Sequence, residues 1–405
     1  MNAIAKNKTA PRPLLPRLRF AGFRGEWGYQ PLAELATRST RKNARCEINR
    51  VLTNSAEHGV VDQRDFFDKD IANPKNLEGY YIVEKGAYVY NPRISNAAPV
   101  GPVSKNNIAT GIMSPLYTVF QFHGNGDEFY AHYFKTTHWH QYMRESSSTG
   151  ARHDRMSISN DAFMNLPLPV STPAEQQKIA ACLSSLDTLI TAQTQKLDTL
   201  KTHKKGLMQQ LFPRAGETTP RLRFAEFRGE WGQEKLAELI TTITPPAKLQ
   251  TSDYLAQGSF PIIDQSQEAI CGWTNDADAV VNESLPLIVF GDHTCAIKFV
   301  NEPFAQGADG IKIIKAKTTI AIEYLFQSIN HNPLTMGDYK RHFSDLKERA
   351  VFFPDIKSGE QQKIAACLSS LDELITAQAQ KVAALQTHKK GLMQQLFPAQ
   401  AKASA

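Results

Sequence analysis

The sequence predicts an α+β protein in which two mixed α/β domains are separated and joined by two long antiparallel helices, a coiled coil, with an internal pseudo-twofold repeat. The first observation behind this prediction is duplication. Residues 175–213 and 360–398 agree at 33 of 39 positions, and residues 16–28 and 220–232 agree at 12 of 13. The inserts framed by these segments have little sequence in common, so the repeats define the architecture before any local pattern is considered.

The second observation is the spacing of apolar residues in the longer repeat. They recur at alternating steps of four and three, a period typical of a helix that packs along another helix. A helix over residues 173–211 would be about 58 Å long, too long to bury this stripe inside one small domain. We therefore expect the two copies to pack on each other. The seam positions are Ile179, Leu183, Leu186, Ile190, Gln193, Leu197, Leu200, Leu207 and Leu211 in the first copy and Ile364, Leu368, Leu371, Ile375, Gln378, Val382, Leu385, Leu392 and Leu396 in the second.

The repeat also predicts how the helices meet. Two like segments related by a pseudo-twofold axis across the helix axes run antiparallel, so equivalent residues meet only at the middle. The middle residue of 175–211 is Gln193, and we expect it to face Gln378, a polar pair that fixes the register at some cost in stability. The alternative is that each helix packs on its own insert.

Capping and proline signals set the helix ends. Thr172 can cap the first helix, Pro173 suits its first turn, and Pro213 and Pro398 end the two helices. The chain then divides into a tail with the first constant frame (1–28), the first insert domain (29–172), the first spacer helix (173–213), a linker with the second constant frame (214–232), the second insert domain (233–357), the second spacer helix (358–398) and a tail (399–405).

Length and composition favour a globular protein that stays inside the cell. A chain of 405 residues exceeds one ordinary core, and 41% hydrophobic residues are enough for several domains. No run reaches the roughly 18 apolar residues of a membrane helix, and residues 1–15 lack the apolar centre of a secretory signal. Five cysteines without CxxC spacing fit a reduced compartment, so we expect a cytoplasmic protein without membrane contact.

The charge balance permits contact with a polyanion without requiring it. The net charge is +6, yet residues 233–357 carry 11 Lys and Arg against 16 Asp and Glu. Arginine reads guanine in the major groove, and Lys, Ser and Thr bind phosphates, so basic and polar groups at matching ends of the inserts are candidate DNA contacts. The alternative is that they are solvated surface charges. The candidates are Arg38, Arg41, Lys42, Arg45, Ser114, Tyr117, Arg144, Arg152, His153, Arg155, His293, Lys340, Arg341, His342, Lys347 and Arg349.

No pattern indicates a self-sufficient active site, and we expect neither catalytic nor metal-ligating residues. His132, His138 and His140 lie close in sequence, but no nearby acid or cysteine completes a familiar metal spacing. Asp292 and His293 are neighbours that would point to opposite faces of a strand, which favours a turn over a catalytic pair. The sequence also lacks a phosphate-binding loop and the Asn-Pro-Pro-Phe or Asn-Pro-Pro-Tyr run of amino-methyltransferases.

Several motifs together resemble the specificity (S) subunits of type I restriction–modification systems. They are the frame Arg19-Phe20…Phe23…Gly25…Trp27, the insert motifs Gly111–Phe120 and Gly291–Thr294, the helix opening Glu175–Ala180 and the helix end Lys204–Pro213. Each motif alone is moderately specific, whereas their duplicated order is highly specific. The near-identity of the two helical segments is similar to the IC branch of that family.

This resemblance implies a sequence-specific DNA-binding subunit without catalytic activity of its own. The inserts would be two target-recognition domains, each reading one half of a bipartite, asymmetric site in double-stranded DNA with a fixed gap. The helices would dock two adenine-N6 methyltransferase (modification) subunits and, through them, restriction subunits. No cofactor is expected on this chain, since S-adenosylmethionine, ATP and Mg²⁺ would belong to the partners.

Three other functions are compatible with parts of the sequence. The chain could be the specificity subunit of a fused restriction–methylation enzyme, which differs only in its partner. It could be a coiled-coil adaptor that does not bind DNA and whose inserts bind protein. It could also be a nuclease or methyltransferase subunit with its own site, built on the group His132–His140.

Overall fold

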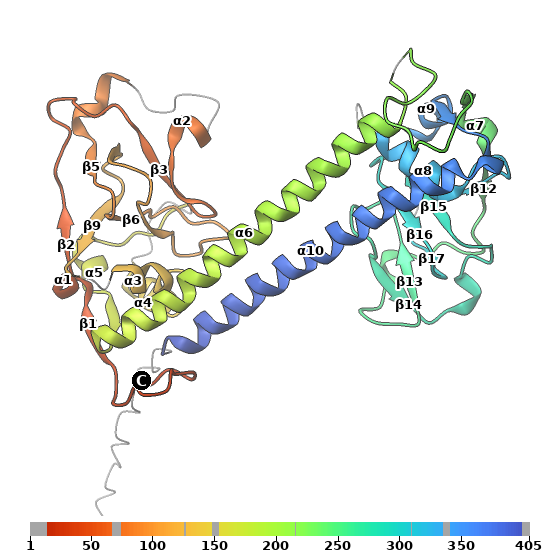
Figure 1. Ribbon diagram of the computed structural model, residues 1–405. Coiled ribbons are helices and arrows are strands. Elements are labelled where there is room, and N and C mark those ends of the chain that lie inside the picture. The colour runs from red at the N-terminus through yellow and green to blue at the C-terminus, as the bar shows by residue number, and fades with distance from the viewer. Residues whose placement is uncertain are drawn as a thin grey trace, which may run out of the picture. The chain divides into compact units, whose positions relative to one another are not determined.

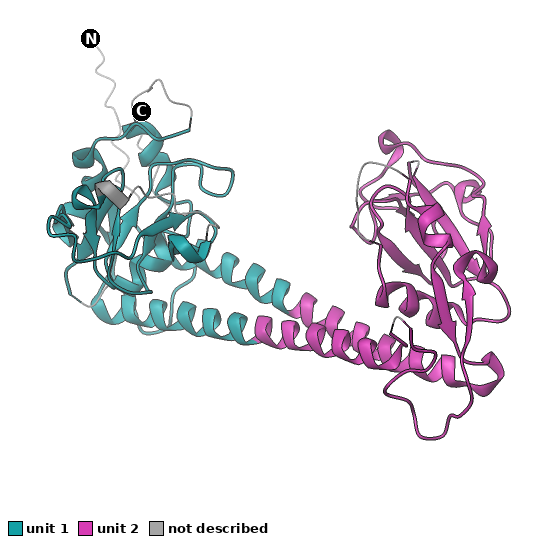
Figure 2. Ribbon diagram, turned by 90° about the horizontal axis from the view of Figure 1, so that it is seen from above, with its two compact units in different colours: residues 1–192, 382–405 teal, residues 193–381 magenta. Residues whose placement is uncertain are grey.

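The structure is a computed structural model that describes residues 14–66, 74–124, 127–147, 154–214, 216–308, 310–334 and 341–398. Figure 2 shows its two compact units. Unit 1 comprises residues 1–192 and 382–405, and unit 2 comprises residues 193–381. Each unit therefore combines one insert with half of each long helix. In the described part of the chain, no helix is both long enough and apolar enough to cross a membrane.

The insert of unit 1 is built on a four-stranded antiparallel sheet in the order β2-β9-β6-β7, with the smaller pairs β3-β4 and β5-β8 beside it (Figure 1). The strands are β1 (Gly28–Pro31), β2 (Ala36–Ser39), β3 (Leu52–Ser55), β4 (Gly59–Asp62), β5 (Tyr81–Val83), β6 (Tyr88–Tyr90), β7 (Val103–Lys105), β8 (Gly111–Met113), β9 (Thr118–Phe122) and β10 (Pro167–Val170). The helices are α1 (Leu32–Leu35), α2 (Gln63–Phe66), η1 (Pro74–Gly79), α3 (Asp127–Tyr133), α4 (His140–Ser146) and α5 (Asn160–Met164).

The insert of unit 2 contains a four-stranded antiparallel sheet in the order β12-β18-β15-β16 and a three-stranded sheet in the order β14-β13-β17. The strands are β11 (Gly232–Lys235), β12 (Ile240–Ile243), β13 (Phe260–Ile263), β14 (Gly272–Thr274), β15 (Leu287–Gly291), β16 (Ile297–Val300), β17 (Ala305–Gln306), β18 (Ile311–Ala316) and β19 (Ala350–Phe353). The helices are α7 (Leu236–Leu239), η2 (Thr251–Asp253), η3 (Ala277–Ala279), α8 (Ile322–His331), α9 (Phe343–Lys347) and η4 (Ile356–Ser358).

The two inserts share a topology although their sequences differ. In each insert, a Leu-Ala-Glu-Leu helical turn leads into an edge strand of the four-stranded sheet, β2 or β12. This edge strand pairs with the strand of the sheet that comes last in the sequence, β9 or β18. The first strand of each insert pairs antiparallel with its last strand: β1 with β10, and β11 with β19. The chain therefore enters and leaves each insert at adjacent strands.

The long helices are α6 (Pro173–Leu211) and α10 (Glu360–Leu396), and every seam position predicted from the sequence is buried or half-buried. The expected Gln193–Gln378 pair is present, since the Gln378 Nε2 donates to the backbone O (2.9 Å) and Oε1 (3.0 Å) of Gln193. Further along, the Lys204 Nζ lies 2.6 Å from the Asp372 carboxylate. From Gln193 to Lys204 the residue number rises along α6, whereas from Gln378 to Asp372 it falls along α10. The two helix segments in unit 2 therefore run in opposite directions.

Both long helices also pack on the inserts. In unit 1 the core joins Leu183 of α6 and Leu396 of α10 to insert residues such as Phe120. In unit 2 it joins Leu211 of α6 and Leu368 of α10 to its own insert. Each long helix thus begins in one core and ends in the other.

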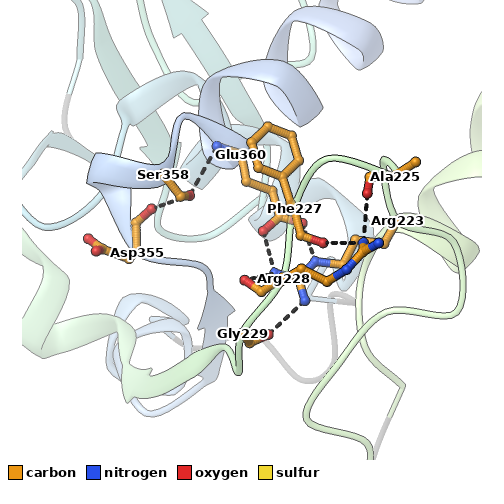
Figure 3. Close-up of polar contacts among 8 residues, drawn as sticks. All are labelled: Arg223, Ala225, Phe227, Arg228, Gly229, Asp355, Ser358 and Glu360. Carbon is orange, nitrogen blue, oxygen red and sulfur yellow. Dashed lines mark hydrogen bonds and ion pairs between the residues drawn. The ribbon is translucent and has the colours of Figure 1, made fainter.

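A buried ion pair attaches each constant frame to the start of a long helix. The Arg223 guanidinium donates from Nε and Nη2 to the two carboxylate oxygens of Glu360, both at 2.7 Å, and from Nη1 to the carbonyl of Gly229 at 2.6 Å (Figure 3). Arg19 makes the same bonds to Glu175 in unit 1, and both glutamates are almost fully buried. Hydrogen bonding to the carboxylate raises the pKa of each arginine. The repeated frame is therefore a structural clamp.

A second repeated ion pair differs between the units in a neighbouring group. In unit 1 the Lys389 ammonium contacts the Asp187 carboxylate, and the buried His132 lies beside them, with its Nε2 3.0 Å from the Ser184 Oγ. Burial lowers the pKa of His132 to about 4, and the charge of Lys135 contributes. In unit 2 the corresponding pair is Lys204–Asp372, and an amide, Gln327, donates to the aspartate at 2.8 Å. Beside this ion pair, unit 1 therefore has a titratable imidazole where unit 2 has an amide.

Protonation of His132 is expected to destabilise unit 1 as the pH falls. Its pKa in the unfolded chain is near 6.5, so between pH 6.5 and about 4 the unfolded state binds the extra proton and unfolding becomes easier. One such group contributes about 2 kcal/mol of stability that is present above pH 6.5 and lost by pH 4.5. His132→Gln, which copies Gln327, should reduce that pH dependence in urea unfolding of unit 1. An unchanged pH profile in the variant would show that the imidazole is not the titrating group.

Candidate nucleic-acid interface

The shared topology allows the two inserts to be compared position by position. The Leu-Ala-Glu-Leu turns make Ala36 of β2 equivalent to Ile240 of β12, and strand pairing extends this match across both sheets. In β6 Tyr90 pairs with Thr118, and in β15 Phe290 pairs with Lys312. The residues three positions after these two strand residues are Arg93 and His293. Arg93 and His293 therefore occupy the same place in the two inserts.

In unit 1 the loop after β6 brings two arginines side by side. The Asn91 side chain, which is buried, accepts a hydrogen bond from the backbone N–H of Arg93 at 3.0 Å and so fixes the turn. Arg93 pairs with Arg155 in an isolated antiparallel bridge, next to a hydrogen bond from the Met156 N–H to the Pro92 carbonyl at 2.9 Å. Arg93 is exposed. The two arginines lie at paired backbone positions, and the Arg155 Nε lies 3.5 Å from the Asp154 carboxylate, so the loop carries two cationic side chains and one acidic neighbour.

In unit 2 the loop after β15 is held in the same way. The backbone N–H of His342 donates to the Asp292 carbonyl at 2.8 Å, as Met156 does to Pro92. This bond makes Arg341 the counterpart of Arg155, beside His293. The Asp292 side chain is buried and accepts a hydrogen bond from the Phe343 N–H at 2.8 Å, which holds the start of α9. The carboxylate of Asp292 is thus engaged in fixing the loop.

A polar cavity of about 460 Å³ adjoins this loop in unit 2. Its lining includes three basic side chains, an imidazole and two amides, which are donors and acceptors of the kind that read base edges or bind phosphate. They are Lys248, Lys312, Arg341, His293, Gln265 and Gln306. Positive charge is concentrated here although the insert as a whole is acidic. Among the described residues no cluster of metal-ligating side chains is present.

The other predicted contacts of unit 1 are dispersed. Arg38 lies half-buried on β2, whereas Arg41 is exposed and pairs with Glu84 at 2.8 Å. Lys42 and Arg45 are exposed in the segment that follows, and Arg45 lies 3.7 Å from its neighbour Glu47. These side chains are therefore not gathered with the Arg93–Arg155 pair into one site.

The remaining predicted residues of unit 1 lie on separate elements. Ser114 and Tyr117 are half-buried between β8 and β9, and the Tyr117 Oη is 3.2 Å from the Thr53 Oγ1. Arg144 is exposed in the last turn of α4. Arg152 and His153 lie outside the described residues.

The predicted residues of unit 2 fall into an interior and a surface group. His342 is only 2% exposed, and its Nδ1 lies 3.7 Å from Asp345, so its side chain faces the interior. Lys347 lies over the Phe343 ring at 5.6 Å, and the Arg349 Nη1 donates to the Asn332 carbonyl at 2.7 Å. Arg341 and His293 are the two predicted residues that line the polar cavity. Lys340 lies outside the described residues.

Arg93 is the residue of this interface that sequence reasoning missed. It follows an Asn-Pro pair that reads as a turn, and nothing local distinguishes it from other surface arginines. Its place beside Arg155 depends on pairing between segments more than 60 residues apart in the sequence. Only the register of the sheets shows that it matches His293.

Comparison with known proteins relates part of the chain to a known family. The family model for the type I restriction modification DNA specificity domain matches residues 53–202. The putative type I restriction enzyme MjaX specificity subunit of Methanocaldococcus jannaschii is 25% identical over 276 residues, covering 60% of this chain and 61% of the relative. The EcoR124I/EcoR124II specificity subunit of Escherichia coli is 24% identical over 161 residues, covering 37% and 40%. Residues 53–202 therefore belong to the family of type I restriction modification DNA specificity domains. The chain spans less than two thirds of the length of either of these curated relatives.

Solved structures share this fold. The type I S subunit of M. genitalium matches with a TM-score of 0.64 at 14% identity, over 95% of this chain and 100% of that one. A chain from a structural study of complex assembly and conformational transition in the type I R-M system matches with a TM-score of 0.52 at 15% identity, over 96% and 99%. At such low identity these matches concern the fold alone.

Proposed function

We propose that this chain is the DNA-reading subunit of a type I restriction–modification complex, with one half of a bipartite, asymmetric site read by each insert. The observation that carries the proposal is the matched pair of loops. Two inserts with unlike sequences place a cationic or imidazole side chain, Arg93 or His293, beside an arginine, Arg155 or Arg341. Different side chains on one scaffold suit two readers of different sequences.

We infer that α6 and α10 form an antiparallel coiled coil with pseudo-twofold symmetry, which keeps the two readers at a fixed separation and so sets a fixed gap in the site. The Gln193–Gln378 contact supports this arrangement because it joins equivalent residues of the two repeats. The ion pairs Lys204–Asp372 and Lys389–Asp187 also support it, since each joins the same two repeat positions in opposite order.

The proposed partners are two adenine-N6 methyltransferase subunits and, through them, restriction subunits. The duplicated frames and helices support two equivalent docking sites, because a repeated surface binds two copies of one partner. In this assignment the chain holds no catalytic group, and S-adenosylmethionine, ATP and Mg²⁺ act in the partner subunits, in the cytoplasm. A fused restriction–methylation enzyme as the partner differs only in how these activities are divided.

Exchanging the second insert tests the proposal directly. Residues 233–357 would be replaced by the insert of a related specificity subunit, and the chain would be expressed with its modification partners. Long-read sequencing should then show one half of the methylated motif changed, with the other half and the gap intact. The unaltered chain is the control. Loss of both half-sites, or a motif unaffected by the exchange, would contradict the assignment of one reader to each insert, and a chain that neither binds nor directs methylation of DNA would favour a protein-binding adaptor.

A further inference from the structure

The loops after β6 and β15 can be compared at two neighbouring positions, of which one has the same residue type in both inserts and the other does not. Arg155 and Arg341 are the same residue type at equivalent places, whereas Arg93 and His293 differ at the neighbouring place. The inserts otherwise share little sequence beyond the Leu-Ala-Glu-Leu turn, so the retained arginine reflects a task common to both readers.

The physics of DNA recognition separates these tasks. Phosphate contacts are the same for every sequence and fix the position of a protein on the duplex, whereas contacts with base edges carry sequence information. A phosphate contact can therefore be kept in two readers of different sequences. A base contact must change when the base changes, and a guanidinium and an imidazole offer different donors to the major groove.

Hydrogen bonds hold the backbone near both positions. Asn91 fixes the turn of Arg93 through the hydrogen bond to its N–H, and Asp292 fixes the corresponding turn by binding the N–H of Phe343. In both units a backbone hydrogen bond joins this turn to the segment that carries the retained arginine. The two side chains at each loop are thus presented together from a fixed backbone.

We propose that Arg155 and Arg341 bind the DNA backbone in both half-sites, and that Arg93 and His293 contact base edges and determine one base pair in each half-site. This inference rests on the proposed function and assigns roles within it. Arg93, with its planar fork of donors, fits a guanine in the first half-site. His293 opens onto the polar cavity of unit 2, where Gln265 and Gln306 supply amides for the second half-site.

The experiment uses the chain assembled with its modification subunits and two duplexes, one carrying the methylated motif and one without it. Alanine variants of the four residues are compared by the salt dependence of binding and by the motif that each complex methylates. Arg50→Ala is the matched control, because Arg50 is an exposed arginine outside both loops and both frames, with its Nε 3.3 Å from the Asp62 carboxylate.

For Arg155→Ala and Arg341→Ala we expect weaker binding to both duplexes and a slope of log K against log salt reduced by about 1, with the methylated motif unchanged. For Arg93→Ala and His293→Ala we expect an unchanged salt slope and a roughly 5- to 150-fold loss of discrimination at one base pair of one half-site.

Lysine variants distinguish these roles from a general loss of folding. Arg155→Lys and Arg341→Lys keep the charge and should restore the salt slope, whereas Arg93→Lys lacks the bidentate fork and should not restore discrimination. The inference is overturned if Arg155→Ala or Arg341→Ala changes the motif, or if Arg93→Ala and His293→Ala leave it intact. If the unaltered complex methylates no bipartite motif, the proposed function fails instead.

Discussion

Replacing Arg223 with alanine is expected to lower the free energy of unfolding of unit 2 by about 3–5 kcal/mol. The Glu360 carboxylate is 1% exposed and accepts two hydrogen bonds from this guanidinium, which also donates to the carbonyls of Arg228 and Gly229. Removing the arginine leaves a buried carboxylate without its counter-charge and two carbonyls without these donors. One direct link between the second frame and the start of α10 is then lost, while the Lys363–Glu226 ion pair remains.

Hydrogen exchange read by mass spectrometry can measure this change separately in each unit. Protection should fall across unit 2 in Arg223→Ala while unit 1 keeps its own clamp, Arg19–Glu175. The double variant with Glu360→Gln should recover part of the loss, because it removes the unpaired charge. Arg221→Ala, which removes a solvent-exposed ion pair, should cost at most about 1 kcal/mol. Equal losses in Arg223→Ala and Arg221→Ala would mean that the buried pair adds nothing.

A second large effect is expected from Leu368→Ala, about 2–5 kcal/mol of destabilisation in unit 2. Leu368 lies on α10 with no exposed surface, and it belongs to the core that also contains Leu211 of α6 and Tyr324 of α8. Truncation removes the buried methyl groups and leaves a cavity among three elements. Because the helix supplies this core, local loosening there should spread to the insert.

The helix itself provides the control for this variant. Leu374 lies less than two turns away on α10 but is 54% exposed, so Leu374→Ala should change stability by less than about 0.5 kcal/mol. Urea unfolding, with hydrogen exchange in unit 2 as the readout, measures the stability of both variants. A Leu368→Ala protein as stable as Leu374→Ala would show that α10 does not contribute to this core. Leu183→Ala, the repeat equivalent, should have the same effect on unit 1.

The long helices were predictable from the sequence because their signals are local. The apolar period, Thr172, Pro173 and Pro213 together predict a helix from 173 that ends before Pro213, and α6 spans Pro173–Leu211. The second helix begins at Glu360, two residues later than expected. Ser358 closes a 3₁₀ turn, and Gly359, with φ of 80°, interrupts the path before α10 starts. A left-handed residue cannot continue a helix, and glycine adopts this conformation without strain.

The candidate interface was only partly predictable, because its geometry depends on non-local pairing. The sequence indicated Arg155, His293 and Arg341 as basic or polar residues near the ends of their inserts. It could not show that Arg155 lies beside Arg93, or that His342 turns inward, since these facts follow from sheet register and from the backbone bond to Asp292. Side-chain chemistry was readable from the sequence, whereas its arrangement was not.

The pairing of β1 with β10 and of β11 with β19 has a consequence for how such proteins diversify. In each pair the two strands lie about 4.8 Å apart, the spacing of neighbouring strands in a sheet. The chain therefore leaves the scaffold for residues 32–166 or 236–349, and returns to it, at adjacent strands. An inserted segment of any length can be accommodated if its two ends form this strand pair and its helical turn packs in the core. New specificities can therefore arise by exchange of whole inserts, while the duplicated frames and helices stay unaltered.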